Sequence, residues 1–389
     1  MTLTCKTAGE SHGPCGIALL EGLPAGITLD IEFINNELSR RQGGYGRGGR
    51  QDIEKDKVVF LTGVRGGVTT GAPLTIQIVN KDSRLDDANT TPPIHNPRPG
   101  HADLAGALKW QTNDCRNTLE RASARETAAR TAAGAVARCF LREFNIECFG
   151  FVRGMLDAHA PTEVTNENWK NIRDARDDSD VYCPDDSTCK AIIEHIRNAK
   201  KEKNTVGGLC EVHVFGCPPG LGSCVQWSEK LDAKLAGAVM GIQAFKAVEI
   251  GMGQECGRLL GSQVHDPIEY NTATTQESHL GFTRPTNHAG GIEGGMTNGM
   301  PVVIRGTMKP IATLLQGMDS VSLISGEAIR SDYERSDVCA LPAASVVMEN
   351  AVGFEIAAAF LDSFSGSTIQ MVHASHNEYV QSARKIIPS

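Results

Sequence analysis

The sequence predicts an α+β fold in which antiparallel sheets and a few long helices occupy separate stretches of the chain. Short apolar runs joined by tight turns, such as Gly13-Pro14 and Pro24-Ala25-Gly26, indicate strands with hairpin-like connections. Three other segments carry apolar residues at helical spacing. Strands that follow one another through tight turns favour antiparallel pairing, so a doubly wound parallel sheet is not expected.

The N-terminal hundred residues are expected to alternate strands and irregular loops. Residues 2–34 and 58–79 carry the strand-like runs, and residues 36–41 finish a short helix. In residues 42–50 five of nine residues are glycine, which excludes regular structure there. Residues 80–100 form a polar, proline-rich loop.

The helices are predicted at residues 123–144, 229–245 and 341–363, and strands are expected at 204–226 and 296–314. Ser228 is the expected N-cap of the second helix, and Pro342 fits the first turn of the third. Residues 157–203 are polar and charged with one helical patch, and they are predicted to form a peripheral insertion. The length of 389 residues permits one large domain or two to three smaller ones.

Charge and composition exclude several classes of protein. Lys and Arg number 38 against 46 Asp and Glu, a formal charge of −8, so nucleic acid is not an expected partner and any anion site must be local. The N-terminus resembles no secretory signal, and Glu349 and Glu355 interrupt the most apolar stretch, so we expect a cytoplasmic protein without membrane contact. Twelve cysteines without a CxxC pair indicate free thiols.

A metal site is a minor alternative at Cys210, His213 and Cys217. In a strand, the offset of three places His213 on the face opposite Cys210, so a shared metal would need a bulge or turn. The expectation is therefore that the protein binds no metal.

Two histidines stand in glycine-containing motifs, Gly9-Glu10-Ser11-His12-Gly13 and Arg98-Pro99-Gly100-His101-Ala102-Asp103. Imidazole exchanges a proton near neutral pH, which suits acid–base catalysis. Taken alone, a histidine near a turn more often has an ordinary hydrogen-bonded role.

Arg40, Arg41, Arg47 and Arg50 bring four guanidinium groups and no carboxylate into residues 39–51. Arginine binds phosphate and carboxylate bidentately, and a glycine-rich backbone can wrap a small anion. The same residues are also typical of an RGG-like segment that binds RNA. These residues alone do not distinguish an anion site from an RNA-binding segment.

Residues 121–127 open the first predicted helix, and helix N-terminal amides are natural phosphate sites, although Ser123 is equally suited to a cap. In the C-terminal half, glycine-rich residues 287–299 precede Lys309-Pro310-Ile311 and residues 334–337. None of these segments has the spacing of a dinucleotide fingerprint or a Walker loop.

Read in order, these motifs resemble the chorismate synthase family, and the resemblance covers residues 9 to about 365. It rests on Gly9–Gly13, Arg41–Arg50, Arg98–Asp103, Ser123–Thr127, Gly294–Gly299, Lys309–Ile311 and Glu334–Asp337. The resemblance implies a single large domain over residues 1–389, built as a β-α-β sandwich with helices between antiparallel sheets and assembled as a homotetramer.

The implied reaction is the anti-1,4 elimination of phosphate from 5-enolpyruvylshikimate 3-phosphate, which gives chorismate and requires reduced FMN. By resemblance, His101 protonates the leaving phosphate, His12 acts on the reduced flavin, and Asp337 serves proton removal. Substrate or anion contacts are implied for Ser11, Arg41, Arg47, Arg50, Arg98 and Arg125, with Arg41 and Arg47 also matching NADPH contacts in relatives that reduce their own flavin.

The positions that match FMN contacts are Arg121, Ala122, Ser123, Gln243, Ala244, Gly294, Lys309, Pro310, Ile311, Ala312, Thr313 and Arg335. Ala122 and Gln243 depart from the serine and asparagine of close relatives, which puts side-chain contacts there in question. No separate reductase domain is visible, so flavin reduced by an external reductase is expected, with NADPH as a possible reductant. The alternatives are a flavin-dependent NADPH oxidoreductase and, remotely, an RNA-binding module.

Overall fold

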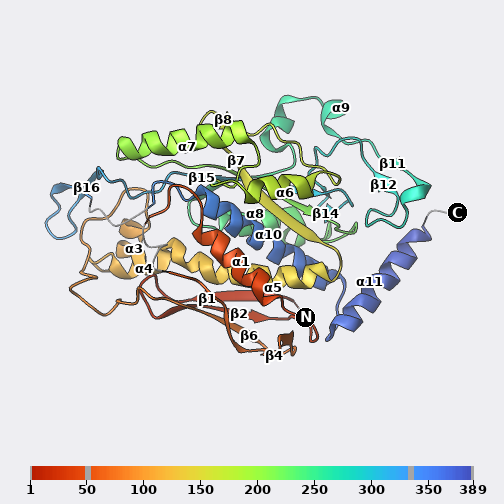
Figure 1. Ribbon diagram of the computed structural model, residues 1–389, viewed down its shortest axis with the longest axis horizontal. Coiled ribbons are helices and arrows are strands. Elements are labelled where there is room, and N and C mark those ends of the chain that lie inside the picture. The colour runs from red at the N-terminus through yellow and green to blue at the C-terminus, as the bar shows by residue number, and fades with distance from the viewer. Residues whose placement is uncertain (1, 49–53, 332–336, 387–389) are drawn as a thin grey trace.

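Two antiparallel sheets lie on either side of a layer of helices in the computed structural model, which describes residues 2–48, 54–331 and 337–386 (Figure 1). All pairs of neighbouring strands in the two larger sheets are antiparallel. The α+β class predicted from the sequence is confirmed.

The four-stranded sheet has the order β1-β2-β6-β3, with strands β1 (Thr4–Ala8), β2 (Cys15–Glu21), β3 (Val59–Thr62) and β6 (Leu74–Val79). Leu74, Ile76 and Ile78 are buried at every second position of β6, because one face of the sheet covers the core. Helix α5 (Thr127–Arg142) packs against β2 and β6.

The five-stranded sheet has the order β10-β15-β9-β7-β8, with β7 (Glu147–Met155), β8 (Ala158–His159), β9 (Gly208–Phe215), β10 (Phe245–Ile250) and β15 (Val302–Met308). Helix α10 (Leu341–Ser363) packs against β7 and β9. Phe149, Phe151 and Phe215 form a separate buried cluster with Trp169 of α6 (Trp169–Asp177). Helices thus cover this sheet where its strands are most apolar.

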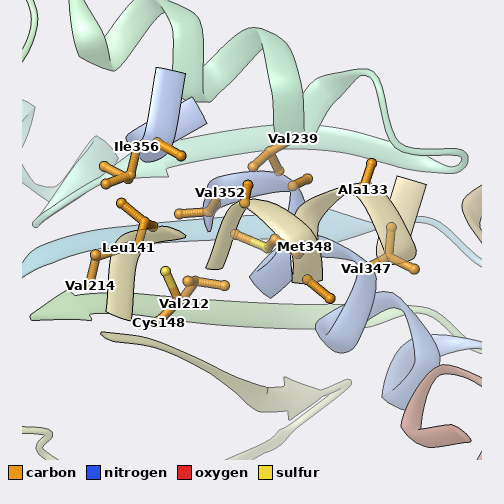
Figure 2. Close-up of a cluster of buried hydrophobic side chains, with 14 of the residues drawn as sticks. Ala133, Leu141, Cys148, Val212, Val214, Val239, Val347, Met348, Val352 and Ile356 are labelled. Carbon is orange, nitrogen blue, oxygen red and sulfur yellow. The ribbon is translucent and has the colours of Figure 1, made fainter. Parts of the chain in front are cut away.

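The main core lies where α10 meets α5. Figure 2 shows Val347, Met348 and Val352 of α10 in one cluster with Leu141 of α5 and Val212 of β9. By length and composition α10 could cross a membrane, but 89% of its most apolar window is buried inside the protein. It is therefore explained as a core helix.

Helices α1 (Ile31–Gln42) and α8 (Leu231–Met240) complete the central layer against α10. The remaining elements are β4 (Val64–Arg65), β5 (Val68–Thr69), α3 (Asp103–Lys109), α4 (Arg116–Ala122), η1 (Ala124–Glu126), α7 (Asp186–Lys201), η2 (Trp227–Glu229), η3 (Gly253–Arg258), α9 (Gly261–Val264), β11 (Glu269–Tyr270), η4 (Thr272–Thr274), β12 (Phe282–Thr283), β13 (Ile292–Glu293), β14 (Met296–Thr297), β16 (Asp319–Val321), β17 (Ala328–Arg330) and α11 (Ile369–Arg384).

The second predicted helix was wrong at both ends. Helix α8 begins after Lys230 rather than Ser228 and ends at Met240, and residues 245–250 form strand β10. Ala244 has a φ of 71°, a left-handed conformation that turns the chain so that Phe245 pairs with Met308. Pairing with β15 therefore overrides the helical pattern of these residues.

The region predicted as a peripheral insertion contains α6 and α7. Helix α7 packs against β7 and β8, and its Ile192 and Ile196 side chains are buried in the main core. The division of the chain into one domain with an insertion stays a prediction.

A network of buried ion pairs connects three helices to α10. The Glu349 carboxylate, only 1% exposed, lies 2.8 Å from Arg138 of α5, 3.1 Å from Arg176 of α6 and 3.2 Å from Arg40 of α1. Removing one partner from such a network leaves a buried charge uncompensated, so these ion pairs fix where α1 and α5 stand relative to α10.

We predict that Gly134→Ala destabilises the protein by about 1–3 kcal/mol or more, because an added Cβ would overlap the Asn350 carbonyl group of α10. Gly237→Ala on α8 is the matched control, since nothing lies within 4 Å of its added Cβ. That control should be neutral or stabilising by about 0.5–1 kcal/mol. Urea unfolding measures both, and equal effects would contradict the close α5–α10 packing.

Candidate functional site

A cavity of about 650 Å³ opens where the N-terminal turns of α5 and α10 meet the loop after α1. Arg125 lines it from η1, the short 3-10 helix before α5, Thr127 lines it from the start of α5, and Ala343 and Ala344 line it from the start of α10. Because helix N-termini carry free amides and partial positive charge, both helices favour an anion here.

Positive side chains dominate the lining of the cavity. Its described walls contain seven Lys or Arg residues and three carboxylates: Arg41, Arg47, Arg84, Arg98, Arg125, Lys246 and Lys309 against Glu54, Asp82 and Asp337. The chain as a whole has a charge of −8, so positive charge is concentrated locally. Such a cavity suits a ligand with several negative charges.

Arg41 and Arg125 share one counter-charge, Asp56. Asp56 Oδ2 lies 2.6 Å from Arg41 Nη2 and 2.7 Å from Arg125 Nη1, and its carboxylate is buried. Burial lowers the pKa of Arg41 to about 10, and the nearby Arg125 charge acts in the same direction. An anionic ligand would relieve the repulsion between these two guanidinium groups.

Arg47 stands beside the carboxylate expected to serve proton removal. Its Nη1 atom lies 2.8 Å from Asp337 Oδ2, and both residues line the cavity. The glycines around Arg47 allow the loop to turn inward, with Gly44 and Gly46 at φ values of 95° and 93°.

His101 is held by Asp103 and Arg98. The Asp103 carboxylate accepts a hydrogen bond from His101 Nδ1, and Arg98 Nε donates to Asp103 Oδ2 at 2.8 Å. Burial opposes ionisation of Asp103, but the bonds from His101 and Arg98 outweigh it and lower the pKa of this carboxyl group below its usual range. Asp103 therefore stays an acceptor, which fixes the imidazole ring.

His12 has a similar arrangement with a different carboxylate. Its Nδ1 atom lies 2.9 Å from Glu120 Oε1, and its backbone amide donates to Glu120 Oε2 at 2.8 Å. Burial opposes ionisation of Glu120, yet these bonds keep the pKa of Glu120 lowered. Beside it, the Ser123 hydroxyl donates to the Ser11 hydroxyl at 3.1 Å.

Eight of the residues expected to contact flavin belong to the cavity wall. Gln243 Nε2 donates to Glu126 at 3.1 Å, which leaves the buried Gln243 Oε1 without a hydrogen-bond partner among the described residues. Lys309 Nζ donates to the Gly100 carbonyl at 3.0 Å, and burial lowers its pKa, as does the neighbouring charge of Lys246. This wall offers a free acceptor and two cations.

The structure brings most of the predicted site residues together. The cavity lining includes Ser11, His12, Arg41, Arg47, Arg98, His101, Ala122, Ser123, Arg125, Gln243, Ala244, Lys309, Ile311, Ala312, Thr313 and Asp337. Both departures from close relatives, Ala122 and Gln243, are in this set.

Three predicted residues do not line the cavity, and two lie outside the described residues. Arg121 bonds instead to the carbonyls of Thr7 and Gly9, Gly294 turns the β13–β14 hairpin, and Pro310 is absent from the lining. Arg50 and Arg335 fall in the segments that the structure does not describe.

The carboxylates that pair with the cations and imidazoles were not predicted from the sequence: Asp56, Glu120, and Asp103 as a partner of His101. Asp82, Arg84 and Lys246, which line the cavity, were not predicted either. The sequence carries a local signal only for Asp103, which lies in the same turn as Arg98. Asp56 and Glu120 reach their partners only through tertiary structure.

The Cys210 and His213 side chains lie on opposite faces of β9. Cys210 Sγ contacts the Leu341 carbonyl, whereas His213 Nε2 lies 2.7 Å from Glu211 and the ring stacks near Phe151. Within residues 2–48, 54–331 and 337–386, no group of three potential ligands is placed to hold a metal ion.

Comparison with known proteins decides the family. The family model for chorismate synthase matches residues 3–361. The chain belongs to the chorismate synthase family. It is therefore a lyase of the shikimate pathway, which leads to the aromatic amino acids, and enzymes of this family require reduced FMN.

Curated relatives match over nearly their whole length. The chorismate synthase of Desulforamulus reducens is 47% identical, covering 98% of this chain and 99% of its own. Those of Desulforudis audaxviator and Shouchella clausii are 46% and 47% identical, with at least 95% of each chain covered. A crystal structure of a chorismate synthase superposes with a TM-score of 0.81 at 36% identity, covering 99% of both chains.

We predict that Asp56→Asn lowers the thermal midpoint, because losing a shared buried counter-charge costs about 3–5 kcal/mol. Inorganic phosphate should restore part of the loss by supplying negative charge to Arg41 and Arg125. Asp362→Asn, which removes the partly exposed partner of Lys234, is the control and should respond to phosphate like the wild type. A phosphate-independent deficit in Asp56→Asn would contradict the anion site.

Proposed function

We propose that the cavity carries out the anti-1,4 elimination of phosphate from 5-enolpyruvylshikimate 3-phosphate to give chorismate. The observation that carries this proposal is the convergence of five guanidinium groups and two imidazoles, each imidazole paired with a buried carboxylate. A substrate with two carboxylates and a phosphate needs this positive charge, and the leaving phosphate needs a proton donor.

Arg41, Arg47 and Arg125 bind the negative groups of the substrate. Guanidinium groups bind carboxylate and phosphate bidentately. The burial of Arg41 excludes water and so strengthens the contacts that Arg41 makes with the substrate. Ser11 adds a hydroxyl beside them. These residues hold the substrate ring in a single orientation, which lowers the barrier to elimination.

His101 donates a proton to the departing phosphate. With Nδ1 occupied by Asp103, its Nε2 atom is left for the substrate, and Arg98 stabilises the charge that develops on the phosphate oxygens. Asp103 acts as a positioning residue because it sets the ring orientation.

His12 and Asp337 serve the flavin side of the reaction. Glu120 fixes His12 through Nδ1 and so directs Nε2 toward Arg84 and Asp82 on the cavity wall. Asp337, held by Arg47, takes up the proton removed from C6 of the substrate. Both assignments come from the resemblance to the family, and the positions of these side chains around one cavity support them.

The residues fit FMN as the cofactor. The free Gln243 Oε1 can accept from a ring N–H, and Ala122, Ala244 and Ala312 add small apolar side chains to the lining. Lys309 and the hydroxyl of Ser123 suit the phosphate tail, with Ile311 and Thr313 alongside. When bound, reduced FMN supplies the electron density that the loss of phosphate demands.

Two alternatives have less support. An RNA-binding segment requires exposed arginines, but Arg41 is 4% exposed and Arg47 is paired with Asp337 inside the cavity. An NADPH oxidoreductase would use Arg41 and Arg47 for the nucleotide, and these residues are already engaged around the proposed substrate site. We therefore propose that an external reductase supplies the reduced flavin.

The remaining proposals concern the assembly and its surroundings. The contacts of α5 with one sheet and of α10 with the other support the β-α-β sandwich expected of the family. A location in the cytoplasm is proposed from the resemblance to the family. A homotetramer is proposed from the resemblance to the family.

We predict that the wild type forms chorismate anaerobically with chemically reduced FMN, but not with oxidised FMN, even when NADPH is added. His101→Ala should lower this turnover by about 10²–10⁴-fold, as the loss of a general acid does. His95→Ala is the control, because His95 bonds to the Asn113 carbonyl and does not line the cavity. Turnover of His101→Ala at the wild-type rate would refute its assignment.

A further inference from the structure

A second cavity of about 620 Å³ adjoins the first. Its walls come from the loop 44–48, the C-terminal half of α7 and residues 203–205, with Leu315 and Val338 closing one side. Arg47, Gly48, Thr313 and Asp337 line both cavities. The two spaces therefore have a common wall.

The common wall lies next to the groups that receive the leaving phosphate. Thr313 Oγ1 accepts a hydrogen bond from Arg98 Nη1 at 2.9 Å, and Arg98 Nη2 lies 3.0 Å from His101 Nδ1. On the same wall Arg47 is paired with Asp337 at 2.8 Å. A phosphate protonated by His101 is thus formed beside the second cavity.

Three exposed cations also line the second cavity: Arg197, Lys200 and Lys203. Among the residues that the structure describes, none of the three forms an ion pair, and Arg197 bonds only to the Tyr45 hydroxyl at 3.2 Å. Cations are common in the last turn of a helix, which accounts for Lys200. Lys203 lies beyond the end of α7 at Lys201, yet it faces the same space.

Carboxylates are scarce in this second cavity. Asp337 is the one acidic residue among its described lining residues, and it is already paired with Arg47. Asn204 and Thr205 add polar groups suited to an oxyanion. The lining therefore combines three unpaired cations with hydrogen-bonding groups, which is the chemistry that recognises phosphate.

We propose that the second cavity binds inorganic phosphate, the leaving group of the reaction, after it passes the Arg47–Asp337 wall. This inference rests on the proposed function, because elimination at His101 is what delivers phosphate to that wall. The carboxylates of chorismate stay bound to Arg41 and Arg125. The phosphate binds Arg197, Lys200 and Lys203 and is thereby held away from the product. Phosphate and chorismate then leave separate cavities.

The test measures phosphate binding in the absence of turnover. The protein is loaded with oxidised FMN and saturated with 5-enolpyruvylshikimate 3-phosphate, so the first cavity is filled and no reaction occurs. Equilibrium dialysis with radiolabelled inorganic phosphate should then give one phosphate per chain. The double variant Lys200→Gln/Lys203→Gln should bind this phosphate at least tenfold more weakly.

The matched control is Lys190→Gln/Lys201→Gln, which removes the same charge from α7 at residues that line neither cavity and should bind like the wild type. Unchanged binding in Lys200→Gln/Lys203→Gln would overturn the proposal, as would a substrate-saturated wild type that binds no phosphate. Substrate that fails to saturate the protein would instead contradict the proposed function, so the two failures are distinguishable.

Discussion

Holding several guanidinium groups close together inside an acidic chain is the constraint on which the structure depends. Like charges at short range repel strongly where water is excluded, so each arginine needs a nearby carboxylate. Asp56 serves both Arg41 and Arg125, while Asp337 serves Arg47. Glu54 also lies 3.8 Å from Arg125, yet cations still outnumber carboxylates among the described lining residues, so positive charge remains for an anionic ligand.

The scaffold supplies the rigidity that this cluster requires. Glu349 joins α1, α5 and α6 to α10, and the α5–α10 contact at Gly134 leaves no room for a side chain. Arg41 stands in the last turn of α1, one residue after the anchored Arg40. The core network therefore holds the ligand-facing arginine at a fixed distance from the helix N-termini that line the cavity.

The fold class, helices α5 and α10, and about half of the cavity-lining residues were predicted from the sequence, because these depend on local patterns and on motifs that resemble a known family. Helix α8 was misplaced because strand pairing of Phe245 with Met308 depends on distant residues. Asp56 and Glu120 carry no local signature, since their partners lie 15 or more positions away. The second cavity was not predicted from the sequence either, because its cations have the pattern of a solvated helix end at α7.

The most direct test of the account is a crystal structure with oxidised FMN and 5-enolpyruvylshikimate 3-phosphate bound. The account predicts phosphate oxygens within hydrogen-bond distance of Arg98 and His101, with the substrate carboxylates on Arg41 and Arg125. It also predicts that the flavin ring contacts Gln243. A substrate bound elsewhere, with these arginines still paired only to their carboxylates, would contradict the claim that the cavity is built around the negative charges of the substrate.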